Sequence, residues 1–300
     1  MARWLVFVGS LFLGSPALAQ NADDPSALGI PIEIGRSFTL DSAVMGDERH
    51  LNVWLPPEYE QSDKEYTVVY LLDGAVSQDF THIAGLASLA SLSWTFGPMI
   101  IVGVETKDRR SELTPPASDK RYIQQFPESG SAAKFRRMLR NEVIPYIEAN
   151  YRAGGRRALM GESLAGLFVV DTLLREPGSF HDYISISPSL WWDDRRGLSS
   201  LNVEQSFRGL ADRRLFLAMA DEGGTMQDGV DLLLKGLAEM PSSVLEVKYS
   251  DRSSHETHAT IYHGAAEDAM RWLYPAPPYD YGPTPWYLIE GASPPVAEGE

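Results

Sequence analysis

The sequence predicts an α/β fold with a mostly parallel, doubly wound sheet and helices on both faces. Two segments, 67–72 and 99–104, are almost continuously apolar, as expected for strands buried on both faces of a parallel sheet. Later in the chain, strand candidates alternate with segments of helical periodicity. This alternation is typical of right-handed crossovers, and in such sheets the ligand site lies beyond the carboxyl ends of the strands.

The remaining elements follow from local patterns. Leu51, Val53 and Leu55 alternate with polar neighbours and predict an outer strand. Apolar residues recur at helical spacing between 131 and 151, and Pro145 is expected to bend or divide this helix. Further strands are predicted at 183–187, 213–220 and 244–249, and helices at 230–237 and 265–273.

Composition narrows the class of protein. The chain has 300 residues, a net charge of −15 and no cysteine. A nucleic-acid partner is not expected, since phosphate binding needs clustered cations. Without cysteine, no disulfide framework and no lipid attached through a cysteine is expected. The segment 20–274 suits one α/β domain with a large core.

Both ends differ from this domain. Residues 1–19 predict a secretory signal peptide, with an early cation, a short apolar run and a small-residue cleavage site before Gln20. The apolar run is too short to span a bilayer, so we expect no stable membrane insertion and a soluble periplasmic or secreted protein. Residues 275–300 form a proline-rich tail, in which 286–289 is expected to dock on the domain.

The segment 156–168 is the most informative motif. It predicts a strand, a tight turn that carries Ser163, and then a helix. This is the nucleophile elbow of the α/β-hydrolase fold, in which the positions two before and two after the serine must be small. Gly161 and Ala165 meet that demand, and Gly166 lets the helix pack closely. The N–H of Leu164 would then point at an oxyanion.

A nucleophilic serine needs a base, and the base needs an orienting acid, which in this fold follow in the order serine, acid, histidine. Three histidines follow the last predicted strand. We expect His258 to be the base, with His255 as the alternative, while His263 is more typical of a cap or surface residue. No metal-binding H-E-x-x-H spacing is present, and we expect neither metal nor cofactor.

The acid should end the preceding strand. That strand leads directly into Asp221 and Glu222, and either carboxylate is able to reach the imidazole. Strand alternation does not decide between them, because the strand has ended by then. Asp228 is a third candidate, although it is more typical of a helix cap.

A second oxyanion donor is expected from the loop after the strand at 67–72. That loop begins Asp73-Gly74-Ala75. Gly74 would let the backbone approach the substrate, which would leave the N–H of Ala75 free to donate.

These motifs together resemble the "putative esterase" branch of the α/β-hydrolases, which includes siderophore esterases that open enterobactin- and bacillibactin-type trilactones. The resemblance runs from about residue 49 to 273. Its pieces are Leu-Leu-Asp-Gly at 71–74, the segments 108–115, 142–148 and 187–192, the elbow, and the His258 loop. The Leu-Leu-Asp-Gly stretch is also similar to that of mycolyltransferases, in which the residue matching Ala75 donates to the oxyanion.

The resemblance implies that Ser163 is the nucleophile, His258 the base and Glu222 the acid. The chain departs from the family pattern at Ala165, where glycine is usual, and at Glu162, where histidine or glutamine is common. A carboxylate at Glu162 is expected to alter the pH profile or the leaving-group preference, or else to support its neighbours.

The expected substrate contacts are Asp73, Gly74, Arg109, Trp191 and Trp192. Arg109 is placed to bind an anionic or phenolic oxygen, unless it is only a surface arginine in a charged run. The two tryptophans follow a strand at the correct edge to stack on an aromatic acyl group, and at least one is expected to pack in the core.

The sequence therefore predicts a secreted serine hydrolase that cleaves a small-molecule carboxylic ester through an acyl-enzyme. A trilactone siderophore or another ester of an aromatic acid is the substrate that the resemblance implies. An acyltransferase on the same scaffold and a non-catalytic ligand-binding homologue are the alternatives.

Overall fold

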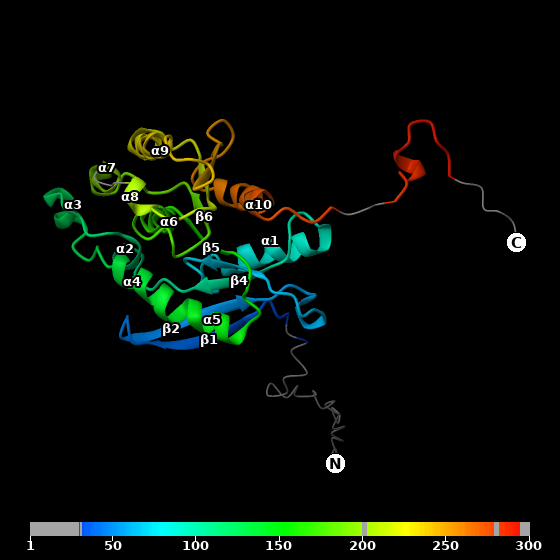
Figure 1. The fold of residues 1–300 in the computed structure, drawn as a ribbon, viewed down its shortest axis with the longest axis horizontal. Helices are drawn as coiled ribbons and strands as arrows, with labels where there is room; N and C mark the ends of the chain where they lie inside the picture. Colours follow the sequence, from blue (N-terminus) through cyan, green and yellow to red (C-terminus); the bar gives the residue numbers. More distant parts are fainter. Residues whose placement is uncertain (1–29, 31, 200–202, 279–281, 295–300) are drawn as a thin grey trace, which may run out of the picture. The chain divides into compact units, whose positions relative to one another are not determined.

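The computed structural model describes residues 30, 32–199, 203–278 and 282–294. The predicted signal peptide at 1–19 lies outside these residues. Within the described part, eight strands form one sheet in the order β1-β2-β4-β3-β5-β6-β7-β8 (Figure 1). The strands are β1 (Arg36–Ser42), β2 (Asp47–Trp54), β3 (Thr67–Leu71), β4 (Met99–Val104), β5 (Arg157–Glu162), β6 (Asp182–Ile186), β7 (Arg213–Met219) and β8 (Leu245–Asp251).

The sheet is parallel from β4 to β8 and antiparallel at one edge. β2 pairs antiparallel with both β1 and β4, and the remaining pairs are parallel. This confirms the predicted doubly wound α/β-hydrolase fold. β2 is not the outer strand that its alternation predicted, because β1 pairs along its free side.

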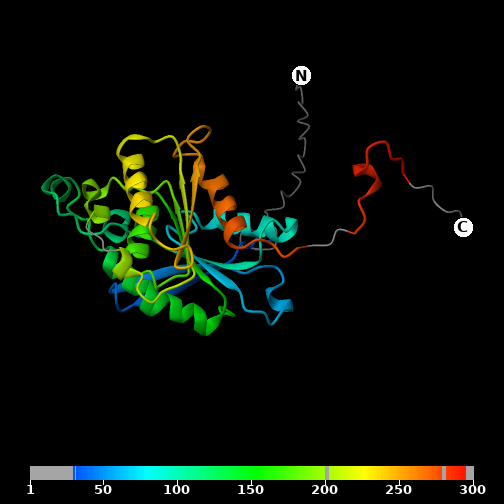
Figure 2. The same cartoon turned by 45° about the horizontal axis from the view of Figure 1, so that its top comes forward.

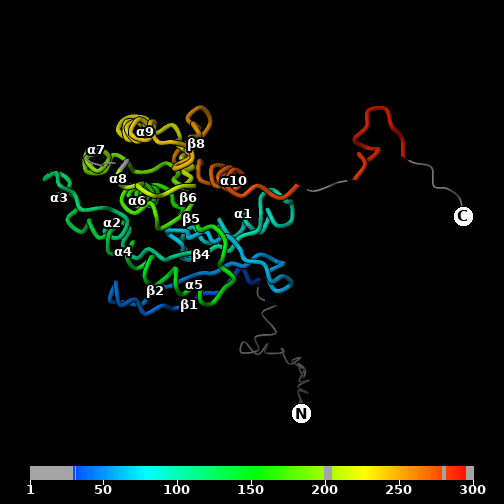
Figure 3. Tube along the Cα trace, in the orientation of Figure 1, coloured from blue at the N-terminus to red at the C-terminus, as the bar shows by residue number. Residues whose placement is uncertain are grey.

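Helices cover both faces of the sheet. They are α1 (Phe80–Ser93), α2 (Arg109–Leu113), α3 (Lys120–Gln125), α4 (Ala132–Met138), α5 (Ile144–Asn150), α6 (Leu164–Arg175), α7 (Arg196–Ser199), α8 (Val203–Ser206), α9 (Gly224–Leu237) and α10 (Ile261–Leu273). α1 and α10 share one apolar core with the sheet, whereas α4, α5, α6 and α9 share the other. Figure 2 shows the two layers, and Figure 3 lets the element order be followed along the chain.

Most predicted elements are confirmed, with shifts at their ends. The helix predicted at 131–151 is divided, since a π-helical turn, Leu139–Val143, separates α4 from α5, and Pro145 lies in the first turn of α5. The sequence patterns missed β1 and α1. α1 escapes a periodicity analysis because Leu89 and Leu92 lie exposed on its outer side, 61% and 74% accessible.

Two smaller expectations are wrong. The tail residues Trp286, Tyr287, Leu288 and Ile289 are exposed rather than docked. Asp228 lies inside α9 and pairs with Arg195, so it does not cap that helix, which begins after Gly223. A membrane-crossing helix, long and apolar enough, is not found among the described residues.

Gly74 provides a test of the packing between β3 and β4. A Cβ at this position would lie 2.3 Å from Gly103 Cα and from Val104 N, both backbone atoms that cannot move aside. We expect Gly74→Ala to lower the free energy of unfolding by roughly 1–3 kcal/mol. Gly85→Ala is the control, because Gly85 lies in α1 with open space around it, and alanine there should stabilise the helix by roughly 0.5–1 kcal/mol. Urea unfolding of both variants checks this, and equal midpoints would contradict it.

Candidate active site

The turn between β5 and α6 holds Ser163 in a strained conformation. Its φ of 60° and ψ of −116° lie outside the favoured regions for a residue with a side chain. A Cβ on Gly161 would lie 2.5 Å from the Cβ of Ala165, so the turn requires glycine there. The Ser163 N–H donates to the Ile186 carbonyl, and the Ser163 carbonyl accepts from the Ser189 N–H, both at 3.0 Å. The elbow predicted from the sequence is therefore present.

His258 and Glu222 lie side by side at the same rim of the sheet. Nδ1 of His258 lies 2.6 Å from Oε1 of Glu222. Asp221, the other candidate acid, is exposed, and its N–H donates to the Glu256 carbonyl. The other two candidate histidines contact other groups: His255 lies 3.0 Å from the Ser254 hydroxyl, and His263 lies 3.0 Å from His82.

The surroundings of Glu222 favour its ionised form. Burial by itself would raise the pKa of Glu222, but the Ser187 hydroxyl and the hydrogen bond with His258 together bring that pKa below its ordinary value. An ionised Glu222 accepts from Nδ1–H and so fixes the neutral tautomer of His258, in which Nε2 is the free acceptor. The pair has the properties of a base with its orienting acid.

A cleft of about 470 Å³ joins these groups. Ser163 and His258 both line it, together with Leu164 from the start of α6. Leu164 is the first residue of α6, where backbone N–H groups have no partner within the helix and favour negative charge. The other lining residues are Arg109, Arg110, Gln125, Phe126, Ser189, Trp191, Trp192 and Met226.

In the loop after β3, the N–H groups of Gly74 and Ala75 both donate to other parts of the protein. The N–H of Ala75 donates to the side-chain carbonyl of Gln78 at 3.0 Å, and that of Gly74 donates to the Val104 carbonyl at 2.9 Å. Gly74 is needed because a Cβ at this position would meet the backbone of β4. The expectation that the Ala75 N–H is free is therefore wrong for this conformation.

Asp73 contributes to the cleft indirectly, by holding the side chain of Arg109. Its carboxylate is buried, and Oδ2 accepts from Nε of Arg109 at 2.8 Å. Burial raises the pKa of Asp73, and the charge of Arg109 opposes this. Neither Asp73 nor Gly74 lines the cleft, whereas Arg109 does.

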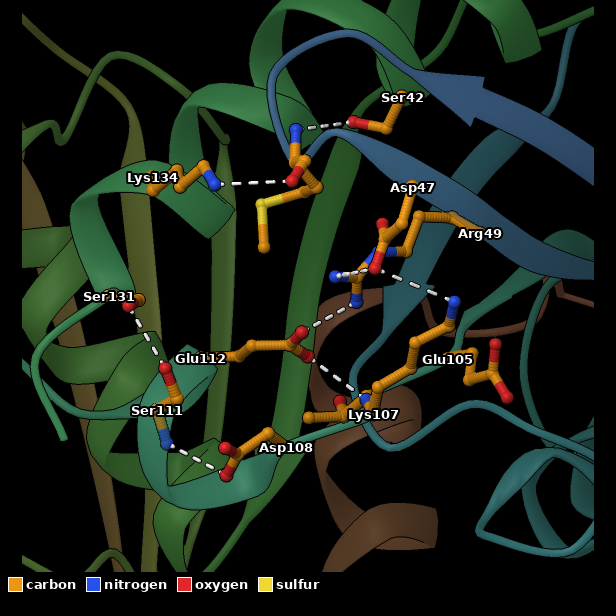
Figure 4. A network of polar contacts seen from close by, with 12 residues as sticks. Ser42, Asp47, Arg49, Glu105, Lys107, Asp108, Ser111, Glu112, Ser131 and Lys134 are labelled. Carbon is orange, nitrogen blue, oxygen red and sulfur yellow. Dashed lines mark hydrogen bonds and ion pairs between the residues drawn. The ribbon is translucent and has the colours of Figure 1, made fainter. Parts of the chain in front are cut away.

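A network of polar contacts anchors α2, which carries Arg109 (Figure 4). Arg49 is buried, and its guanidinium donates to Glu112 at 2.6 Å. The second oxygen of Glu112 accepts from the Lys107 N–H, and Asp108 caps the helix by accepting from the Ser111 N–H. These contacts set the start of α2 and with it the position of Arg109.

The two tryptophans have different roles. Trp192 is buried, and its indole N–H donates to the Pro115 carbonyl at 3.0 Å. Trp191 is half-buried and packs against Tyr122 with nearly parallel rings, 6.1 Å apart. As expected, one tryptophan packs in the core, although both contribute to the wall of the cleft.

Two half-buried carboxyl groups, those of Glu162 and Asp79, interact close to Ser163. Burial raises the pKa of Glu162 to about 7, and the charge of Asp79 adds to this, while His258 and Arg109 oppose it. Burial together with the charge of Asp73 raises the pKa of Asp79 to about 6. Around neutral pH both carboxyl groups therefore titrate next to the cleft.

Several residues of the cleft were not predicted from the sequence. Ser189 is buried, and its hydroxyl lies 3.3 Å from that of Ser163. Phe126 and Met226 are single apolar residues in loop-like or helical segments, where no motif marks them. Of these residues, only Ser189 could have been found from the sequence, because it closely follows the strand predicted at 183–187. Among the described residues, no group of three or more carboxylates and histidines is arranged to hold a metal ion.

Comparisons with known proteins show the family to which the chain belongs. The family described as "Putative esterase" matches residues 42–272. The uncharacterized protein YbbA of Bacillus subtilis is 26% identical over 239 residues, which cover 75% of this chain and 92% of YbbA. Ferri-bacillibactin esterase BesA of the same organism is 32% identical over 142 residues, 43% of this chain and only 49% of BesA. A crystal structure of an IroE-like serine hydrolase from Shewanella oneidensis is similar with a TM-score of 0.69 at 27% identity, covering 80% of each chain.

Glu162 predicts a pH dependence of stability. Because its folded-state pKa of about 7 lies above the ordinary value of 4.5, its contribution is fully present below about pH 4.5 and is lost as the pH rises through 7. We expect Glu162→Gln to gain stability relative to the wild type between pH 5 and 8, by on the order of 1–2 kcal/mol after allowance for partial exposure. Urea unfolding at several pH values measures this. Glu246→Gln, at an exposed position of β8, should follow the wild type, and a pH-independent difference for Glu162→Gln would contradict the assignment.

Proposed function

The chain belongs to the "Putative esterase" family of carboxylic ester hydrolases, and we propose that it cleaves its ester through an acyl-enzyme formed on Ser163. The observation that carries this proposal is the shared cleft: the strained serine and the histidine held by Glu222 line the same cavity. The strain at Ser163 supports the proposal, because residues in such conformations cluster at reactive sites.

The proposed reaction would have two halves, and each would use Ser163 and His258. Ser163 Oγ attacks the carbonyl carbon of the ester, and its proton passes to Nε2 of His258. The carbon–oxygen bond to the leaving alcohol then breaks, and that alcohol takes the proton. Water attacks the acyl-enzyme in the same way, with His258 as base, and releases the acid and the free serine. Glu222 stays ionised and stabilises the imidazolium that forms in each half.

Two donors from the cleft would stabilise the oxyanion. The Leu164 N–H lies at the positive end of α6. Arg109 lines the same cleft, with its Nε held by Asp73, and its terminal nitrogens would supply the second donor. Ala75 would contribute only in a conformation in which Gln78 has left its N–H.

We propose an ester of an aromatic acid as the substrate, with trilactone siderophores as the leading class. Trp191, Trp192 and Phe126 line the cleft, and Tyr122 stacks on Trp191. Arg109 and Arg110 add cations that suit phenolic or catecholate oxygens. The names of the relatives, an esterase of ferri-bacillibactin among them, support this class.

The proposed roles of Ser163, His258 and Glu222 as nucleophile, base and acid lead to a prediction. Ser163→Ala and His258→Ala should each lower kcat/KM for a nitrophenyl ester by roughly 10³-fold or more, since the groups act as a unit. Glu222→Gln keeps the shape of the acid but removes its charge, and should lower kcat/KM by roughly 10²- to 10⁴-fold. Asp221→Asn is the matched control and should stay within about twofold of the wild type.

The steady-state rates of purified variants, each shown to be folded by circular dichroism, measure this. If Asp221→Asn lost activity while Glu222→Gln kept it, the assignment of the acid would be wrong. Wild-type turnover by Ser163→Ala would exclude the acyl-enzyme mechanism.

The aromatic residues that line the cleft, which we call the aromatic wall, lead to a second prediction. Trp191→Ala removes the half-buried ring and should raise KM for a benzoyl ester about tenfold, the upper end of the effect of one aromatic contact. The same variant should hydrolyse an acetyl ester with KM within about twofold of the wild type. Trp286→Ala, in the tail and 40% exposed, is the control. An equal change for both esters would mean that Trp191 supports the fold rather than the acyl group.

A further inference from the structure

The segment 115–126, which we call the lid, ends at the cleft, where its last two residues, Gln125 and Phe126, are part of the lining. It contains the short helix α3, none of whose residues is buried. Ala117, Tyr122 and Phe126 pack against the core but are only partly buried, so the position of the lid also depends on its polar contacts. Figure 3 shows its trace at the same end of the domain as α7, whose Arg196 pairs with Asp119 of the lid at 3.0 Å.

The lid supplies Phe126 to the aromatic wall of the cleft, which Trp191 and Trp192 complete, and Tyr122 packs against these tryptophans. Tyr122 stacks on Trp191, and its ring meets Trp192 edge-on at 5.7 Å. Phe126 packs against the same two tryptophans at 6.1 and 5.5 Å. The Tyr122 hydroxyl donates to the Trp191 carbonyl at 3.0 Å. A bulky acyl group that reached this wall would contact both sides, whereas an acetyl group would need only the neighbourhood of Ser163.

The buried carboxylate of Asp193 connects the lid to the segment that carries Trp191 and Trp192. Asp193 follows Trp192 directly, and it is only 6% exposed. Its oxygens accept from the Ser118 N–H at 3.0 Å, the Ser118 hydroxyl at 2.8 Å and the Asp119 N–H at 2.8 Å. Asp193 has a φ of 47°, in the left-handed region that aspartate tolerates better than most residues. Bonds from an ionised acceptor are about twice as strong as neutral ones, so this carboxylate is the main tie of the lid.

The hydrogen-bonded connection from Asp193 extends through Asp119 into α3. Asp119 caps this helix by accepting from the Arg121 N–H at 2.9 Å. Asp193 thus fixes Ser118 and Asp119, Asp119 fixes the first turn of α3, and α3 with the residue after it carries Tyr122 and Phe126 to the wall.

We propose that Asp193 is a positioning residue that sets the selectivity for bulky aromatic acyl groups by holding the lid against Trp191 and Trp192. This inference rests on the proposed ester hydrolysis. Loss of the tie lets the lid leave the wall, so the binding of an aromatic acyl group weakens while the chemistry at Ser163 is unchanged.

The test compares Asp193→Ala, Asp193→Asn and Asp194→Ala on a benzoyl and an acetyl nitrophenyl ester. For Asp193→Ala we expect KM for the benzoyl ester to rise at least tenfold, with kcat and the acetyl ester within about twofold of the wild type. Asp193→Asn keeps an oxygen for the two N–H groups and an amide for the Ser118 hydroxyl, so it should restore KM to within about threefold. Asp194→Ala is the control for backbone strain, because Asp194 shares the left-handed conformation (φ 51°). Its carboxylate pairs with Arg195 at 2.8 Å and with Arg121 of the lid at 3.3 Å, and exposed ion pairs of this kind contribute little to holding a segment in place.

The outcomes separate this proposal from the proposed function. Equal losses on both esters, no loss on either, or the same loss in Asp194→Ala would each overturn the role of Asp193. If the wild type hydrolysed neither ester, the proposed function would be wrong, and the lid would be tested by calorimetric titration with 2-naphthoate. Binding at least tenfold weaker in Asp193→Ala than in Asp193→Asn would support the lid, and equal affinities would overturn it.

Discussion

The tight turn between β5 and α6 is the constraint on which the rest of the site depends. Ser163 adopts a positive φ there, and the turn closes only because Gly161 has no side chain to meet Ala165. Gly166 extends the constraint, since a Cβ there would lie 3.0 Å from the Ile186 carbonyl. The strain is held by hydrogen bonds to the neighbouring strand and the segment that follows it. Strain of this kind costs on the order of 1–3 kcal/mol, which the packing of a large parallel sheet easily offsets. The serine is thereby fixed above the sheet before any ligand arrives.

The parallel sheet then brings distant parts of the chain to the serine. Glu222 follows β7 and His258 follows β8, so their side chains meet at the carboxyl edge where Ser163 also lies. The cations of the cleft are placed differently, by anchors behind it. The buried pair of Arg49 and Glu112 holds α2, and removing one partner of such a pair typically costs about 3–5 kcal/mol because the other charge is left buried. The site thus combines a serine in a rigid turn with charged groups whose supports lie outside the cleft.

The sequence predicted those features that steric or chemical demands impose on residue types. The elbow was visible because its turn admits only small residues beside Ser163, and the candidate base and acid followed from chain order. Periodicity did not decide between Glu222 and Asp221, because it ends with the strand. The family resemblance implied Glu222, and the structure shows that Glu222 contacts His258. The hydrogen bond from the Ala75 N–H to a nearby glutamine was also not predicted, because the acceptor of a loop N–H depends on how the loop packs in three dimensions. The lid was missed for a related reason: its position depends on a buried aspartate about 75 residues away along the chain.

The central claim is that Ser163 is made nucleophilic by His258, and covalent trapping tests it most directly. Wild-type protein and His258→Ala would be treated with a fluorophosphonate, and the modified peptide identified by mass spectrometry with the rate followed over time. The account predicts a single adduct on Ser163, formed at least 100-fold more slowly without the histidine. An adduct on another residue, or labelling of Ser163 at the same rate in both proteins, would contradict it.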